Sequence, residues 1–232
     1  MHLILLLAMV VADGDGKHNT LTAAEEGAGW ILLFDGKTLD AWRGYQMDQV
    51  GAGWRVDGDA LHFSPPEEGE SETRSDLVSR EQFGDFELAL DWRIEQGGNS
   101  GVMFRVTEDA EKTYHTGPEM QILDDDAHRD GGNPKTSCGA NYALHAPSKA
   151  MARQVGEWNS LRIRVEGDRV QHWLNGEKVV DYRLWDDEWK ALVADSKFAQ
   201  WPGYGMSKRG HVVLQDHGNP VWFRNLEIRR LD

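Results

Sequence analysis

The chain has 232 residues, of which 40% are hydrophobic and 28% charged, an ordinary composition for a folded soluble protein with one large core. Its net charge of −14 opposes binding to polyanions, because non-specific phosphate binding depends on Lys and Arg, so we expect no nucleic-acid partner. The sequence has no Walker loop, GxGxxG, HExxH or GxSxG motif, which removes the usual nucleotide, zinc-protease and serine-hydrolase classes and leaves no organic cofactor to expect.

An apolar run opens the chain. Residues 3–12 read LILLLAMVVA and lead directly into Asp13 and Gly14, a pattern typical of a secretory signal peptide at residues 1–12. The run is shorter than the roughly 20 apolar residues of a membrane-spanning helix, so we expect a secreted or periplasmic protein without membrane insertion. A buried first strand is the alternative. Cys138 is the only cysteine, which excludes an intrachain disulfide, and we expect it to be a small buried residue.

Apolar and polar residues alternate through most of the chain from residue 30 onward, which predicts half-buried β-strands. The pattern is clearest in residues 85–94 (DFELALDWRI). Further strands are predicted at residues 30–34, 53–56, 60–63, 76–79, 101–106, 119–123, 158–165, 169–174, 179–184, 211–215 and 222–228. Asn175 and Gly176 predict a tight hairpin, because a type I′ turn needs positive φ at both central residues.

So many short strands separated by turn signals predict an all-β fold, a β-sandwich or jelly roll. Only residues 187–199 carry helical periodicity, which predicts one short helix at the edge of the sandwich. The chain shows no linker and no internal repeat. We therefore expect a flexible segment at residues 13–27 and a single domain at residues 28–232.

The centre of the expected site lies in residues 117–126. Alternation puts Glu119 and Gln121 on one face of a strand and Met120 and Ile122 on the other. If the apolar pair faces the core, the polar pair faces out of it. Asp124 then joins the polar surface only if a bulge or the strand end redirects it. A solvated acidic strand face followed by an acidic turn is the alternative.

A second polar row follows at residues 211–218 (HVVLQDHG), where Gln215, Asp216 and His217 lie close together. His217 is the candidate general base, because imidazole titrates near neutral pH, although a histidine at a strand end is often simply solvated. Arg105 alternates with the apolar Phe104, so we expect it on the outward, ligand side. There its planar guanidinium would hold Glu119 or bind sugar oxygens.

Aromatic and histidine side chains complete the set of candidates. Trp201 lies in a predicted loop and is the candidate stacking residue, because sugars present C–H faces to aromatic rings. His115, His128 and His145 are scattered among predicted loops. Asp124 and His128 are the candidate ligands of a divalent cation, although their spacing matches no metal motif.

Six segments in this order resemble the 3-keto-disaccharide hydrolase domain family. They are residues 30–42 (WILLFDGKTLDAW), 99–105 (NSGVMFR), 118–125 (PEMQILDD), 158–167 (WNSLRIRVEG), 172–176 (HWLNG) and 211–218, and the resemblance covers about residues 28–231. It implies a concanavalin-like jelly roll. It also implies a glycoside substrate that a separate sugar oxidoreductase has already oxidised to a ketone at carbon 3.

A ketone at carbon 3 acidifies the hydrogen on carbon 2, so a base can remove it, the group on carbon 1 can leave, and water can add back. We expect His217 to act as the base and Glu119 as the acid or a metal ligand. The expected substrate-binding residues are Asn99, Arg105, Gln121, His145, Trp201, Gln215 and Asp216.

Two other functions stay open. Laminarinase-type glycosidases, which share this jelly roll, carry a Glu-x-Asp-x-x-Glu strand motif, and Glu119, Gln121 and Asp124 occupy the same spacing. A conventional two-carboxylate glycosidase using Glu119 and Asp124 is therefore one alternative, although the amide at position 121 weakens it. A non-catalytic carbohydrate-binding module is the other, since the same Trp, Gln and Asp side chains would suffice.

Overall fold

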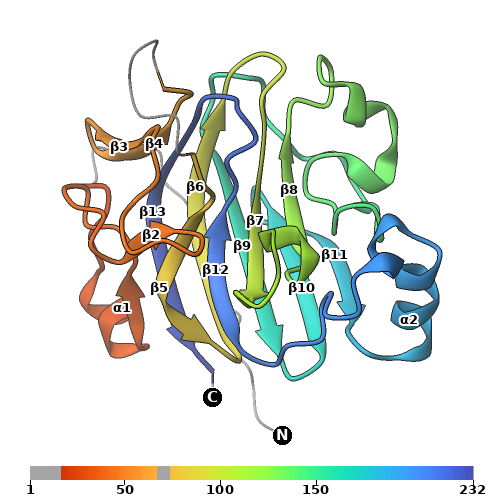
Figure 1. The fold of residues 1–232 in the computed structure, drawn as a ribbon. Helices are drawn as coiled ribbons and strands as arrows, with labels where there is room; N and C mark the ends of the chain where they lie inside the picture. The colour runs from red at the N-terminus through yellow and green to blue at the C-terminus, as the bar shows by residue number, and fades with distance from the viewer. Residues whose placement is uncertain (1–16, 67–73, 232) are drawn as a thin grey trace, which may run out of the picture.

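The computed structural model describes residues 17–66 and 74–231, whose strands form two antiparallel sheets packed face to face (Figure 1). The larger sheet contains β1 (Trp30–Leu32), β3 (Trp54–Asp57), β4 (Ala60–Phe63), β6 (Phe86–Ile94), β9 (Asn159–Glu166), β10 (Arg169–Leu174), β11 (Glu177–Arg183) and β13 (Val221–Arg230). The smaller contains β2 (Trp42–Gly44), β5 (Leu77–Phe83), β7 (Asn99–Val106), β8 (Glu119–Leu123) and β12 (Gly210–Leu214). The predicted all-β sandwich is confirmed.

The order of strands in each sheet brings segments that are distant in sequence next to each other. The eight-stranded sheet runs β11-β10-β9-β6-β13-β4-β3, with β1 added on β13, and the five-stranded sheet runs β2-β5-β12-β7-β8. The hairpin between β10 and β11 turns at Asn175 and Gly176, whose φ values of 50° and 83° fit the predicted type I′ turn. Among the described strands, only β2 was not predicted.

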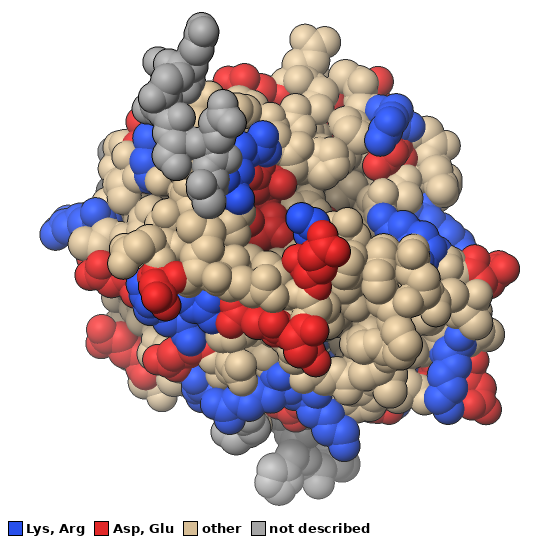
Figure 2. Space-filling model, viewed as in Figure 1, with Lys and Arg blue, Asp and Glu red and all other residues tan. Residues whose placement is uncertain are grey.

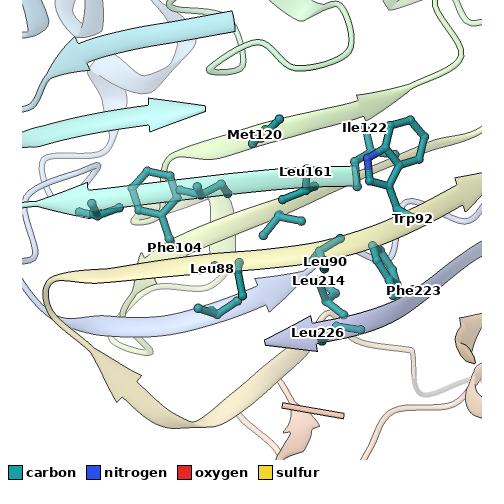
Figure 3. Packing of buried hydrophobic residues seen from close by; sticks show 14 of the residues in the cluster. Leu88, Leu90, Trp92, Phe104, Met120, Ile122, Leu161, Leu214, Phe223 and Leu226 are labelled. Atoms are coloured by element: carbon teal, nitrogen blue, oxygen red, sulfur yellow. The ribbon is translucent and has the colours of Figure 1, made fainter. Parts of the chain in front are cut away.

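The core lies between the inner faces of the two sheets. Figure 3 shows Leu88, Leu90, Trp92 and Phe223 of the larger sheet and Phe104, Met120, Ile122 and Leu214 of the smaller one packed in a single cluster. All of these side chains are at least 97% buried. Burial of apolar surface contributes roughly 25 cal/mol per Å², so this shared layer joins the sheets.

The helices are short and lie at the edges of the sandwich (Figure 1). α1 (Ala23–Gly27) begins with a capping box between Thr22 and Glu25. α2 (Asp187–Ala194) begins at Asp186, whose carboxylate accepts from the amide of Trp189 at 2.8 Å. The predicted helix at 187–199 thus ends earlier, and a 3₁₀ turn, η4 (Lys197–Gln200), follows it. The other 3₁₀ turns are η1 (Thr113–His115), η2 (Arg129–Gly132) and η3 (Pro134–Thr136).

A flexible segment was predicted at residues 13–27, and from residue 17 onward the structure gives this segment contacts of its own. Asn19 and Asn225 of β13 exchange two hydrogen bonds of 2.8 Å between side chain and backbone, and α1 follows directly. The predicted signal peptide at residues 1–12 lies outside the described residues. Within the described ranges, no helix is long and apolar enough to span a bilayer.

Candidate functional site

The outer face of the five-stranded sheet carries the polar side chains of the site. Met120 and Ile122 of β8 enter the core, so Glu119 and Gln121 lie on the opposite face. Gly101 of β7 pairs with Gln121, and Val213 of β12 lies two strands from Glu119 in the same row. The expected orientation of the two polar residues of β8 is therefore observed.

Glu119 lies across β7, and the absence of a side chain at Gly101 makes room for it. A Cβ atom on Gly101 would overlap the Glu119 carboxyl group. Gln121, with its amide nitrogen turned toward them, donates to Glu119 Oε1 at 3.3 Å and to the Ser100 carbonyl at 3.0 Å. The carboxyl group is thus held in one place on a rigid strand, and only 6% of Glu119 is exposed.

Burial raises the pKa of Glu119 to about 8, because the charged carboxylate loses its hydration. The ammonium of Lys197 opposes this rise and the carboxylate of Asp76 adds to it. Lys197 stands at the edge of the face, with its nitrogen 4.3 Å from the centre of the Tyr142 ring. Among the described residues, no carboxylate oxygen lies within 4 Å of that nitrogen. Glu119 is therefore protonated at neutral pH, with a cation nearby.

Asn99, two residues before Gly101 on β7, joins two histidines. Its amide nitrogen lies 3.4 Å from Nε2 of both His128 and His217, and the two imidazole rings are 6.0 Å apart. Its amide oxygen is buried without a hydrogen-bond partner. Partial desolvation lowers the pKa of His217, so this imidazole is neutral at pH 7 and can accept a proton.

A cleft of about 550 Å³ opens beside His217. Residues 45–47, 74–76, 111–114 and 215–217 line it, so it lies between two loops and the ends of β5 and β12. Figure 2 shows acidic side chains around a hollow near the middle of this face. The lining of the cleft includes three acids, Asp76, Glu111 and Asp216, and burial raises the pKa of Asp76 to about 6.

Trp201 lies next to one wall of the cleft. Its ring stacks on His115 at 4.2 Å and meets the edge of Tyr114 at 5.5 Å. Tyr114 lines the cleft directly. The structure therefore places Trp201 behind the aromatic side chain that a ligand in the cleft would contact.

The prediction that Arg105 faces the ligand is wrong. Met103 and Val106 pair with Val213 and His211, so two residues of β7 oppose one residue of β12 and form a β-bulge. Arg105, with φ of 51°, turns away and donates to the Gly84 and Gly167 carbonyls and to Asp85. The bulge breaks the alternation on which the prediction depended.

Two further candidates, His145 and Asp124, are engaged by other parts of the fold. His145 stacks on Tyr182 at 4.6 Å, and burial lowers its pKa to about 4, so the ring is packed among aromatic side chains. Asp124 braces its own loop, because its carboxylate accepts from the amides of Gly97, Asp126 and Ala127.

The expected cation site at Asp124 and His128 finds no support in this geometry. Asp124 is occupied by backbone donors, and His128 Nδ1 accepts from the Asp130 amide at 3.2 Å. In residues 17–66 and 74–231, no three His, Cys, Asp or Glu side chains gather as a metal site. A cation requirement stays a prediction.

Sequence reasoning missed Asp76, Lys197 and Tyr114. Alternation along β5 offers a signal for Asp76, because it shares the outward face with Val78. Tyr114 belongs to the 3₁₀ turn η1 and Lys197 to the 3₁₀ turn η4. No local sequence pattern indicates that either side chain lies near the site.

Comparison with known proteins identifies the family. Residues 29–229 match the model described as the 3-keto-alpha-glucoside-1,2-lyase-like domain. The chain belongs to this family. It is 34% identical over 229 residues to the 3-keto-disaccharide hydrolase of Bacteroides thetaiotaomicron, an alignment that covers 88% of this chain and 79% of the relative. The predicted membership is confirmed, and the chain is an enzyme of the carbohydrate hydrolases.

Solved structures agree with this fold. A Parabacteroides distasonis protein described as a glycosyl hydrolase superposes with a TM-score of 0.84 at 33% identity, over 93% of this chain and 100% of that one. A carbohydrate-binding module from Bacillus subtilis reaches a TM-score of 0.50 at 16% identity, over 82% and 95% of the two chains. The second likeness shows the shared fold alone.

Proposed function

We propose that this protein cleaves 3-keto-disaccharides by elimination and hydration. The observation that carries the proposal is that Glu119, protonated through burial, lies over Gly101 of β7 and that the neutral His217 contacts Asn99, two residues earlier on the same strand. Environments that shift two groups in opposite directions are a mark of acid and base roles. The name of the Bacteroides relative, 3-keto-disaccharide hydrolase, supports the substrate class.

In the proposed first half-reaction, His217 takes the proton from carbon 2 of the keto ring. The bond between carbon 1 and the bridging oxygen then breaks, and Glu119 donates its proton to that oxygen. An enone and a free leaving-group sugar result. Water adds its oxygen to carbon 1, the base returns a proton to carbon 2, and Glu119 regains its proton, so the net reaction is hydrolysis.

Negative charge develops on the ketone oxygen during proton removal. The Gln121 amide lies beside Glu119 and the Asn99 amide beside His217, so a ketone oxygen that replaces one of their present acceptors would meet a donor already held in place, which stabilises such an oxyanion. The ammonium of Lys197, whose charge acts on Glu119, supplies positive charge in this part of the site.

A two-carboxylate mechanism fits less well. It needs a second carboxyl group about 5–5.5 Å from the first for a retaining reaction. Asp124, the candidate partner of Glu119, is already bonded to three backbone amides, and Gln121 replaces the middle acid of the laminarinase-type motif.

Incubation in D₂O of the purified protein with a 3-keto-disaccharide, and separately with the unoxidised sugar, tests the mechanism. We expect cleavage of the keto sugar alone, with deuterium at carbon 2 of the product at early times by NMR. The 3-keto monosaccharide without enzyme controls for spontaneous exchange. Cleavage without deuterium contradicts elimination, cleavage of the unoxidised sugar favours the two-carboxylate alternative, and binding without turnover favours a binding module. A parallel incubation with a chelator tests whether cleavage needs a divalent cation.

Matched variants test the two residues. We expect Glu119→Gln and His217→Gln to lower the rate by about 100-fold or more, the usual contribution of general acid–base groups. Glu227→Gln and His18→Gln are the controls, because these side chains lie near β13 on the larger sheet, and burial also raises the pKa of Glu227, to about 7. Unchanged rates in both site variants would remove them from the mechanism.

We also propose that the enzyme acts outside the cytoplasm, together with an oxidoreductase that makes its keto substrate. The apolar run at residues 3–12 supports export. Fractionation of cells producing the full chain tests this, and an uncleaved protein retained in the cytosol contradicts it.

A further inference from the structure

The cleft beside His217 is built before any ligand binds. Asp76 accepts from the Thr113 hydroxyl and, at 2.8 Å, from the Asp216 amide, so one carboxyl group ties three segments together. The Tyr45 hydroxyl donates to the Ala110 carbonyl at 2.7 Å, which fixes the two loops to each other. These contacts hold the two walls apart at a fixed distance.

The cleft begins next to His217, one of the two groups proposed to react. Gln215 and His217 line the cleft and also contact β7, because the backbone N–H of Gln215 donates to the Gly101 carbonyl at 2.9 Å and His217 lies 3.4 Å from the Asn99 amide nitrogen. From there the cleft extends toward β2 and away from β8. A substrate whose scissile bond lies between Glu119 and His217 therefore has one part over β7 and β8 and the other part in the cleft.

The lining combines carbon faces with polar groups. Tyr114 and Tyr45 both line the cleft, and the hydroxyl of Tyr45 already donates to the Ala110 carbonyl, so the Tyr45 ring offers mainly carbon. The side-chain oxygen of Gln215 is buried without a partner. An apolar occupant would leave that oxygen unsatisfied, whereas a hydroxyl group can donate to it. Rings beside unsatisfied acceptors suit a sugar.

The size and charge agree with this chemistry. A volume of about 550 Å³ lies within the roughly 300–1,000 Å³ of small-molecule sites. Two cationic side chains, Arg74 and Lys112, face three acids, and Arg74 is already paired with Asp216. The near balance of charge fits a neutral occupant.

We propose that this cleft is the leaving-group subsite and that it selects substrates whose leaving group is a second sugar. The inference rests on the proposed function, because it places the keto ring over Glu119 and His217. The Tyr114 ring then packs against the C–H face of the leaving sugar, and Gln215 accepts one of its hydroxyl groups.

Two substrates that differ only in the leaving group test this: a 3-keto-disaccharide and the matching methyl 3-keto-glycoside. We expect Tyr114→Ala to lower kcat/KM for the disaccharide about tenfold, equivalent to about 1.4 kcal/mol, and to change the methyl glycoside less than about twofold. Tyr114→Phe should restore the disaccharide rate, because the ring supplies the contact. Trp222→Ala, on the larger sheet, is the control and should change neither rate.

Equal losses on both substrates, or no loss on either, would overturn the subsite. If the unaltered protein cleaves neither keto sugar, the proposed function fails and calorimetry with the unoxidised disaccharide decides about the cleft. Weaker binding by Tyr114→Ala than by Tyr114→Phe then supports the subsite, and equal binding overturns it.

Discussion

At the scale of single residues, burial acts in opposite directions on Glu119 and His217. Loss of hydration disfavours the charged form, so it raises the pKa of the carboxyl group and lowers that of the imidazole. Both groups are therefore uncharged at neutral pH, as an acid and a base must be before the reaction. Lys197 and Asp76 act on Glu119, and His128, Arg129 and Asp130 act on His217.

This predicts a bell-shaped dependence of the cleavage rate on pH. The rate should fall on the acid side as His217 gains a proton, below its ordinary pKa of about 6.5, and on the alkaline side as Glu119 loses its proton near pH 8. The positive charge of Lys197 lowers the pKa of Glu119, so Lys197→Met should move the alkaline limb to higher pH. Lys190→Met, on α2, should leave both limbs in place, and an alkaline limb unmoved by Lys197→Met would contradict the coupling.

At the scale of elements, two residues of β7 determine which side chains the site contains. Gly101 leaves the space that the Glu119 carboxyl group fills, and the bulge at Arg105 turns that side chain out of the face. Alternation predicted the orientation of β8 correctly because β8 is regular. It failed at Arg105 because a bulge adds one residue, and the sequence NSGVMFR carries no sign of it.

Gly101→Ala should therefore remove activity without unfolding the protein. The added Cβ points to the outer face and displaces the Glu119 carboxyl group, and a misplacement of about 1 Å can lower a rate about 100-fold. Activity assays and thermal melts followed by circular dichroism measure the two effects. Gly27→Ala is the control, because a Cβ there meets nothing within 4 Å. A Gly101→Ala protein that keeps full activity would show that Glu119 does not need this position.

At the scale of the whole molecule, Arg105 fastens the two sheets together at one end. From β7 of the smaller sheet it reaches the turn at Gly84 and Asp85, which leads into β6, and the turn at Gly167 between β9 and β10. Its side chain is 2% exposed, so the charge depends on these partners. Trp185 lies alongside, with its ring centre 5.6 Å from the guanidinium carbon.

Arg105→Met should lower the free energy of unfolding by about 3 kcal/mol or more, because removal of one partner leaves buried oxygens without donors. Urea denaturation followed by tryptophan fluorescence measures it. The exposed pair between Arg169 and Asp181 supplies the comparison, and Arg169→Met should cost about 1 kcal/mol or less. Equal effects of the two substitutions would contradict a fastening role for Arg105.

The sequence predicted the class of fold, the family and the strand that carries Glu119, because each depends on local patterns. It did not predict the order of strands, the cleft or the place of Lys197. Asp76, Thr113 and Asp216 meet only after β5 and β12 pair and η1 folds over them, and no single segment contains that information. The stacking of His145 on Tyr182 of β11 was not visible in the sequence for the same reason, and its role in substrate binding stays a prediction.

The position of β13 bears on how the protein forms. This last strand lies inside the larger sheet, where it pairs with β1, β4 and β6 and separates β4 from β6. The larger sheet can close only after residues Val221–Arg230 are available, and pairings so distant in sequence are slow to form. Completion of the larger sheet therefore waits for β13, because β4 and β6 have no strand between them until it pairs with both.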